Sequence, residues 1–220
     1  MSDLEWLGEA AMLPKKAGRL FCLGGNYTEH QKEMGQLLAE PSVFVKVEGS
    51  LVPGEEPVLY PPDTESLHYE GEFVLVMGEV DPNITPDWRD VAGLAAGLDL
   101  TRRDLQHVAK KDGSPWERAK SWPGSARLSP IVPTATLNDP QTLRLVTRVN
   151  GELRQSAAFS DMIQGPDAIL AYLHHWFPLR AGDLIFTGTP KGVGPLLPGD
   201  RVEVAIENVT GRSWTVVDGY

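Results

Sequence analysis

One stretch of the sequence joins an uninterrupted apolar run to two carboxylates. Phe73 to Met77 contains only apolar side chains, and a strand that is apolar on both faces is typical of a sheet interior. Glu70 and Glu72 precede this run, and they point the same way because alternate strand residues share a face. Two carboxylates entering a core need a compensating charge, and a divalent cation is the simplest candidate. The alternative is a strand whose polar end frays into solvent, because glutamate is usually exposed.

Short apolar segments separated by turn residues predict a fold rich in β-structure. The 18 prolines and 22 glycines are spread through the 220 residues, and Asn150-Gly151 favours a type I′ hairpin. Because most connections are too short for parallel crossovers, we expect a mainly antiparallel or mixed β fold with peripheral helices, an α+β class. Strands are expected at 20–23, 42–47, 73–77, 143–149, 152–156, 183–187, 201–206 and 213–217. Helical structure is expected at 27–38, in part of 85–96, at 101–111 and at 166–176.

Composition limits the partners and the setting. The formal net charge is −10, which argues against a nucleic-acid partner. No apolar run approaches the roughly 20 residues of a membrane span, so no membrane partner is expected. The acidic N-terminus lacks the basic region of a signal peptide. Cys22 is the single cysteine, which excludes an intrachain disulfide and favours a reducing, cytoplasmic location.

Three further positions suggest chemistry, and each has a plainer alternative. His30 and Glu33 lie three residues apart, so on a helix they share a face and can hydrogen-bond. A carboxylate that orients an imidazole makes it a better general base, but the pair is also compatible with a solvated helix surface. Asp99 follows a glycine-rich apolar stretch and could instead cap the next helix. Lys120 lies between two tryptophans, where a surface lysine with a buried stem is the plainer reading.

Two more segments could bind a ligand. Arg103 and Gln106 lie three residues apart and share a helical face. The turn Gly188-Thr189-Pro190-Lys191-Gly192 lacks the phosphate-binding P-loop pattern. Its glycines would instead let backbone N–H groups approach a small anionic ligand.

The order and spacing of these residues resemble the fumarylacetoacetate hydrolase family. The resemblance rests on Glu70-x-Glu72, Asp99 and Lys120, with Asn26-Tyr27 and His30 before them and Gly188-Thr189-Pro190 after them. It extends from about Phe21 to Val217 and includes Val149-Asn150-Gly151-Glu152, Gln155 and Leu179-x-x-Gly182-Asp183. The His30/Glu33 pair and the segments 98–106 and 115–120 are most similar to the short acylpyruvase-like branch. Leu98 in place of asparagine, and Trp122-Pro123-Gly124 in place of Phe-Asp, depart from the family pattern and are expected to reshape the pocket wall.

The resemblance implies a fold, a metal and a reaction. The fold would be a mixed β roll of the family's C-terminal-domain type, with a leader at 1–18 and a single catalytic domain at 19–220. Glu70, Glu72 and Asp99 would bind Mg²⁺ or Mn²⁺, the hard cations that oxygen ligands suit. The substrate would be a small 2-oxo acid, and a homodimer is expected. The remaining site residues would be His30, Glu33 and Lys120 in catalysis, and Arg103, Gln106 and Thr189 in substrate binding.

In this reading, His30 backed by Glu33 activates water for carbon–carbon cleavage of an acylpyruvate to pyruvate and a carboxylic acid. Other activities stay open. The family's two-domain relatives in aromatic degradation decarboxylate or isomerise, so a decarboxylase of oxaloacetate or another 2-oxo diacid, or an isomerase, is the nearest alternative. A different class would be a non-catalytic metal-binding scaffold that kept the carboxylates and lost turnover.

Overall fold

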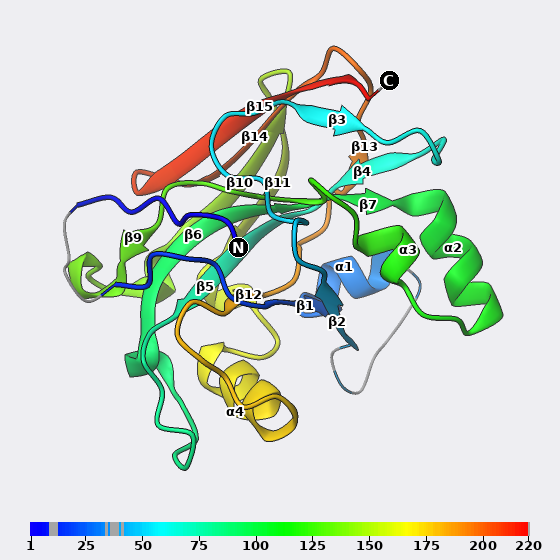
Figure 1. Ribbon diagram of the computed structural model, residues 1–220. Helices are drawn as coiled ribbons and strands as arrows, with labels where there is room; N and C mark the ends of the chain where they lie inside the picture. Colours follow the sequence, from blue (N-terminus) through cyan, green and yellow to red (C-terminus); the bar gives the residue numbers. More distant parts are fainter. Residues whose placement is uncertain (9–12, 34, 36–39, 41, 220) are drawn as a thin grey trace.

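The computed structural model describes residues 1–8, 13–33, 35, 40 and 42–219, in which the strands form three sheets (Figure 1). The seven-stranded sheet follows the order β2 (Ser42–Lys46), β1 (Leu20–Gly24), β12 (Leu184–Phe186), β5 (Gly71–Met77), β6 (Val91–Asp99) and β8 (Ala126–Leu128), and β9 (Val132–Pro133) also pairs with β6. The five-stranded sheet contains β11 (Glu152–Ala158), β10 (Arg144–Val149), β14 (Arg201–Ile206), β15 (Thr210–Asp218) and β3 (Val58–Tyr60). The three-stranded sheet contains β13 (Gly194–Pro195), β4 (Leu67–Tyr69) and β7 (Thr101–Arg102).

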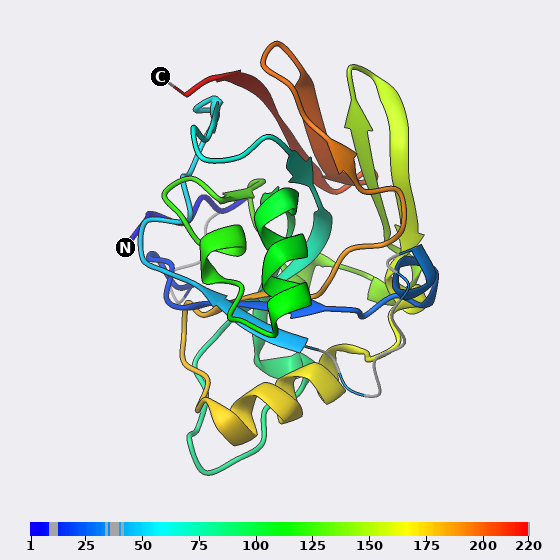
Figure 2. The same cartoon turned by 90° about the vertical axis from the view of Figure 1, so that its right-hand side faces the viewer.

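Two of the three sheets are mixed, the three-stranded sheet is antiparallel, and the helices are peripheral, which confirms the expected fold class. β1 pairs with β12 and β15 pairs with β3 in parallel, whereas β5 pairs with both of its neighbours antiparallel. Figure 2 shows α2 and α3 side by side on one flank of the molecule, with α4 below the large sheet. The helices are α1 (Thr28–Glu33), α2 (Arg103–Asp112), α3 (Glu117–Lys120) and α4 (Pro166–Trp176), with short 3-10 turns at Trp88–Asp90, Thr134–Thr136, Pro140–Thr142 and Phe159–Asp161.

Strand β5 lies between two hydrophobic clusters. Phe73, Leu75 and Met77 belong to the larger cluster, and Val74 and Val76 belong to the smaller one. All seven residues of the strand are buried. The strand is therefore apolar on both faces because both faces are covered, as the sequence predicted.

The paired strands β5 and β6 bring their carboxylates to one end of the sheet. Gly71 lies opposite Leu98, and the backbone N–H of Asp99 donates to the carbonyl of Glu70 at 2.8 Å. Glu70 and Asp99 are thus neighbours across the two strands. This register adds Asp99 as the third carboxylate of the candidate metal-binding cluster, beside Glu70 and Glu72.

Most predicted elements are confirmed, and one is confirmed only in part. The helix at Pro166–Trp176 has the predicted bounds, and the hairpin residues Asn150 and Gly151 have φ angles of 53° and 84°, as a type I′ turn requires. The partial helix expected over 85–96 is a 3-10 turn capped by Asp87, followed at Val91 by β6. Residues 91–96 form an apolar run without a polar face. This suits β6, which is a central strand with neighbours on both sides. The helix expected over 27–38 is present as α1, and much of its second half lies outside the described residues.

The described part of the segment before residue 19 lies against the sheet. Asp3 and Lys16 form an antiparallel bridge, and Trp6 pairs with Ile131. Leu4 and Ala17 are buried in the smaller cluster. The division into a leader and a catalytic domain at residue 19 stays a prediction. Among the helices described, none is long and apolar enough to cross a membrane.

Truncating Leu75 should destabilise the fold strongly, because its side chain is fully buried between sheets. We expect Leu75→Ala to lower the free energy of unfolding by about 2–5 kcal/mol. Leu153→Ala removes the same atoms from a side chain that is 54% exposed. It should change the free energy of unfolding by less than about 0.5 kcal/mol. Urea unfolding of both variants measures the difference, and equal losses would contradict the assigned core.

Candidate active site

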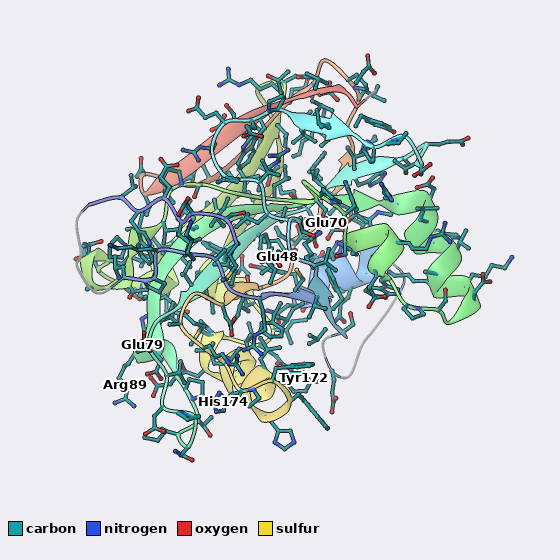
Figure 3. All side chains as sticks on the ribbon, in the orientation of Figure 1. Glu48, Glu70, Glu79, Arg89, Tyr172 and His174 are labelled. Atoms are coloured by element: carbon teal, nitrogen blue, oxygen red, sulfur yellow. The ribbon has the colours of Figure 1, made fainter. Side chains whose placement is uncertain are left out.

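Glu70, Glu72 and Asp99 form a buried carboxylate cluster at the end of β5 and β6. One oxygen from each residue lies within 4.8 Å of the others, and the exposed fractions are 6%, 1% and 0%. Figure 3 shows Glu70 in the interior on the side of α2 and α3, far from Tyr172 and His174 of α4. The strand end does not fray into solvent. Three hard oxygen donors converging at this spacing suit Mg²⁺ or Mn²⁺.

Three basic side chains surround the cluster. Lys120 Nζ lies 2.8 Å from Glu70 Oε2 and 2.9 Å from Asp99 Oδ2. Arg103 Nη2 lies 2.5 Å from Glu70 Oε1, and Lys46 Nζ lies 2.8 Å from Asp99 Oδ1. Lys120 is 2% exposed, so it is not a surface lysine. Asp99 is buried among cations, and α2 begins without a side-chain cap, so the capping alternative for Asp99 is wrong.

The cations do not compensate the carboxylates equally. Burial alone would raise the pKa of Glu70, but Lys120 and Arg103 outweigh burial and hold it well below its usual range. Burial raises the pKa of Glu72, and the charges of Asp99 and Glu70 raise it further. Glu72 accepts a hydrogen bond from the backbone N–H of Gly188 at 2.8 Å, which compensates it only in part. A bound cation would therefore favour the ionised form of Glu72 most.

His30 and Glu33 form the predicted pair at the beginning of the chain. His30 Nδ1 lies 3.0 Å from Glu33 Oε2, and Glu33 also accepts from the backbone N–H of Gly192 at 3.2 Å. His30 is buried, so its ring is not on a solvated helix surface, whereas Glu33 is exposed. The Asn26 side chain forms hydrogen bonds with the backbone of Gln164 and Thr187, and these fix the chain just before α1. With Nδ1 held by the carboxylate, Nε2 is the ring nitrogen left to act as a base.

A pocket opens above the carboxylate cluster. Six of the predicted site residues line it, namely His30, Glu70, Arg103, Gln106, Lys120 and Thr189. The other lining residues are Leu23, Gly24, Gly25, Gln31, Ser42, Phe44, Lys110 and Trp116. Glu33 joins the site through His30, whereas Glu72 and Asp99 join it through the carboxylate cluster. The structure thus brings all the predicted site residues together, and their individual roles stay predictions.

The glycine-rich turn supports protein carboxylates through its backbone. The N–H groups of Gly188 and Gly192 donate to Glu72 and Glu33, so our expectation that these groups approach a ligand is wrong. Gly192 has a φ of 97°, and a Cβ there would lie 2.1 Å from the carbonyl oxygen of Arg154. Only glycine fits such a position.

Sequence reasoning gave no role to several residues that the site uses. Lys46 carries a buried ion pair to Asp99, and its signal was a lysine at the end of an apolar strand. Gln155 donates to Thr189 Oγ1 at 2.7 Å and accepts from the Gly71 N–H at 2.9 Å, so it joins the turn to β5. Lys110 lines the pocket seven residues after Arg103, a spacing that keeps both on one helical face.

The two departures from the family pattern do not line the pocket. Leu98 is fully buried in the larger cluster. Trp122 packs beside two cations, with Arg102 4.6 Å and Lys46 5.6 Å from its ring centroid. Our expectation that these positions reshape the pocket wall is therefore wrong.

Replacing Glu72 by glutamine should separate metal binding from folding. Glutamine keeps an acceptor for the Gly188 N–H but removes a buried charge whose ionisation is unfavourable in the metal-free protein. We expect Glu72→Gln to abolish Mn²⁺ binding in calorimetry and to raise the free energy of unfolding of the metal-free protein at pH 7. Because folding raises the pKa of Glu72, this stability gain should shrink as the pH falls. Unchanged Mn²⁺ affinity in a folded variant would exclude the site.

Comparisons with known proteins agree with this site. The model of the fumarylacetoacetate (FAA) hydrolase C-terminal family matches residues 19–217. Oxaloacetate tautomerase YcgM of Escherichia coli is 40% identical over 206 residues, covering 92% of this chain and 93% of that protein. The mitochondrial oxaloacetate tautomerase FAHD1 of Mus musculus is 41% identical over 202 residues, with 90% of each chain covered.

A solved relative carries a metal and an organic acid. The crystal structure of fumarylpyruvate hydrolase from Pseudomonas aeruginosa in complex with Mn²⁺ and pyruvate has a TM-score of 0.90 and 34% identity, covering 99% of this chain and 96% of that one. The family match, the identities and the shared fold all extend over nearly the whole chain. The chain belongs to the fumarylacetoacetate hydrolase family.

Proposed function

We propose that this protein is an Mg²⁺- or Mn²⁺-dependent hydrolase that cleaves acylpyruvates to pyruvate and a carboxylic acid. The observation that carries the proposal is a pocket lined both by His30, which Glu33 holds, and by Glu70 of the carboxylate cluster. A base and a cation site on one pocket are what hydrolysis of a 2,4-dioxo acid needs. The solved fumarylpyruvate hydrolase, which shares the fold, supports the same reaction class.

Each site residue has a distinct role in the proposed reaction. His30 takes a proton from water, and the resulting hydroxide adds to the distal carbonyl carbon. When the bond between that carbon and its neighbour breaks, the electron pair passes to the pyruvate part as an enolate, and His30 returns the proton to carbon. Glu33 orients the imidazole and stabilises its charged form. Arg103, Gln106 and Thr189 bind the substrate, and Lys120 places positive charge beside the enolate oxygen. A cation held by Glu70, Glu72 and Asp99 would act as a Lewis acid toward the 2-oxo acid.

A second candidate is keto–enol tautomerisation of oxaloacetate. It is favoured by relatives that are named for this activity and are 40% and 41% identical. The same base could move a proton between carbon and solvent, with Lys120 beside the developing enolate. Decarboxylation of oxaloacetate passes through a similar enolate and belongs to the same panel of tests. All three reactions share a 2-oxo acid substrate.

A panel of acylpyruvates and oxaloacetate, assayed with added Mg²⁺ or Mn²⁺, decides between them. Pyruvate release from acylpyruvates measures hydrolysis, and ultraviolet absorbance of the enol measures tautomerisation. Release of CO₂ measures decarboxylation. Lack of metal-dependent turnover on every substrate would instead indicate a non-catalytic metal-binding scaffold.

Replacing His30 should separate hydrolysis from decarboxylation. Hydrolysis needs a base to activate water, whereas decarboxylation needs only the bound 2-oxo acid and charge stabilisation. We expect His30→Ala to cut acylpyruvate cleavage by about 10²–10⁴ and decarboxylation much less. Glu33→Gln should give a milder form of the same split. His107→Ala, which changes an exposed histidine of α2, is the control. Equal losses of both activities with metal binding unchanged would show that His30 does not activate water.

We also propose a homodimer and a cytoplasmic location, the first from the resemblance and the second from the single cysteine. Strand β2 lies at an edge of the seven-stranded sheet, and Val45 and Val47 beside this edge are 38% and 51% exposed. An exposed strand edge with apolar side chains favours a dimer in which a second subunit covers that edge. Light scattering should give twice the chain mass of 24.1 kDa, and a monomer at working concentration would count against the dimer.

A further inference from the structure

Helix α2 presents three polar side chains to the pocket. Arg103, Gln106 and Lys110 all line it, and their spacing of three and four residues puts them on one helical face. Arg103 bonds Gln106 Oε1 at 2.5 Å and Glu70 Oε1 at 2.5 Å, so these two lie next to the carboxylate cluster. Lys110 is one helical turn further along. The face therefore runs along α2 away from the cluster.

Aromatic side chains hold Lys110 in place. Its Nζ lies 5.2 Å from the ring centroid of Trp116, within the range of a cation–π contact. Trp116 in turn contacts Phe44 at 6.0 Å between ring centroids, and both rings line the pocket. Lys110 is half-buried rather than extended into solvent. An ammonium held at a pocket wall in this way is suited to binding an anion.

The charges at the site favour a substrate with two carboxylates. Among the residues that the structure describes, the cations Lys46, Arg103, Lys110 and Lys120 equal in number the carboxylates Glu33, Glu70, Glu72 and Asp99. A divalent cation would leave two positive charges in excess, which a dicarboxylate cancels and a monocarboxylate cancels only in part. Burial lowers the pKa of Lys110, and the nearby charge of Arg103 lowers it further. An anion beside Lys110 would relieve that repulsion.

We propose that Lys110 is a specificity-determining residue that binds the distal carboxylate of a 2-oxo dicarboxylate whose 2-oxo acid end lies at the Glu70/Glu72/Asp99 cluster. This rests on the proposed function for the position of the 2-oxo acid. It goes beyond that function by assigning the recognition of the second carboxylate to one side chain. Arg103 and Gln106 lie too close to the cluster to be the best candidates for the distal end.

A matched pair of unreactive ligands tests the assignment. 2-Oxoglutarate and 2-oxopentanoate have the same chain length, and only the first ends in a carboxylate. Calorimetry on the Mn²⁺-loaded protein should show that Lys110→Met weakens 2-oxoglutarate binding by about 10- to 100-fold, the usual size of a charge-assisted hydrogen bond. 2-Oxopentanoate binding should change less than about twofold, because only the distal contact is lost. Lys110→Arg keeps the charge and should keep most of the preference.

Lys111→Met is the matched control, because Lys111 is the next residue and is exposed outside the pocket. It should leave both affinities unchanged. Equal weakening of both ligands by Lys110→Met would show that Lys110 acts through the packing of Trp116, and an unchanged preference would also overturn the assignment.

Turnover on the substrate panel is measured separately. If the wild type turns over 2-oxo acids but Lys110→Met keeps the preference for 2-oxoglutarate, only the assignment of Lys110 is overturned. A Lys110-dependent preference without turnover on any substrate overturns the proposed reaction alone. A loaded wild type that binds neither ligand overturns the assignment, and one that also turns over no substrate overturns both.

Discussion

Three carboxylates meet in the interior of this protein, and the electrostatic cost of holding them there explains much of what surrounds them. An unpaired buried charge is strongly unfavourable. Lys46, Lys120 and Arg103 lie against Glu70 and Asp99 at 2.5 to 2.9 Å. These cations come from β2, α3 and the start of α2. The need to neutralise one cluster therefore connects segments that are far apart in the sequence.

Strand β5 supplies the rigid base for this arrangement. Both of its faces are covered by apolar clusters, so the residues at its start have little freedom to move. Gln155 ties the same end of the strand to the turn at Gly188, through Gly71 and Thr189. The turn then holds Glu72 and Glu33 through its backbone. A single network thus positions both the carboxylate cluster and the His30/Glu33 pair.

The pocket combines a polar wall with an aromatic one, and this contrast bears on substrate choice. Arg103, Gln106 and Lys110 come from α2, whereas Phe44 and Trp116 come from β2 and the residue before α3. Relatives with similar sequences are named for different reactions on 2-oxo acids. A shared enolate explains how one arrangement of base, cation site and positive charge could serve each of them. In our proposal, Lys110 then selects among these 2-oxo acids.

The sequence by itself determined the β-rich class, the helix at Pro166–Trp176, the Asn150-Gly151 hairpin and the pairing of His30 with Glu33. These depend on local periodicity, turn chemistry and spacing along one helix. Family-like motifs also selected the three carboxylates, the His30/Glu33 pair, Lys120, Arg103, Gln106 and Thr189. The tertiary structure alone decided that Lys46 and Gln155 join the site, because their contacts lie across strands that spacing cannot relate. It also placed the face of α2 that carries Lys110 against the pocket. It also made residues 91–96 a strand, since an apolar run without a polar face takes its form from the neighbours that cover it.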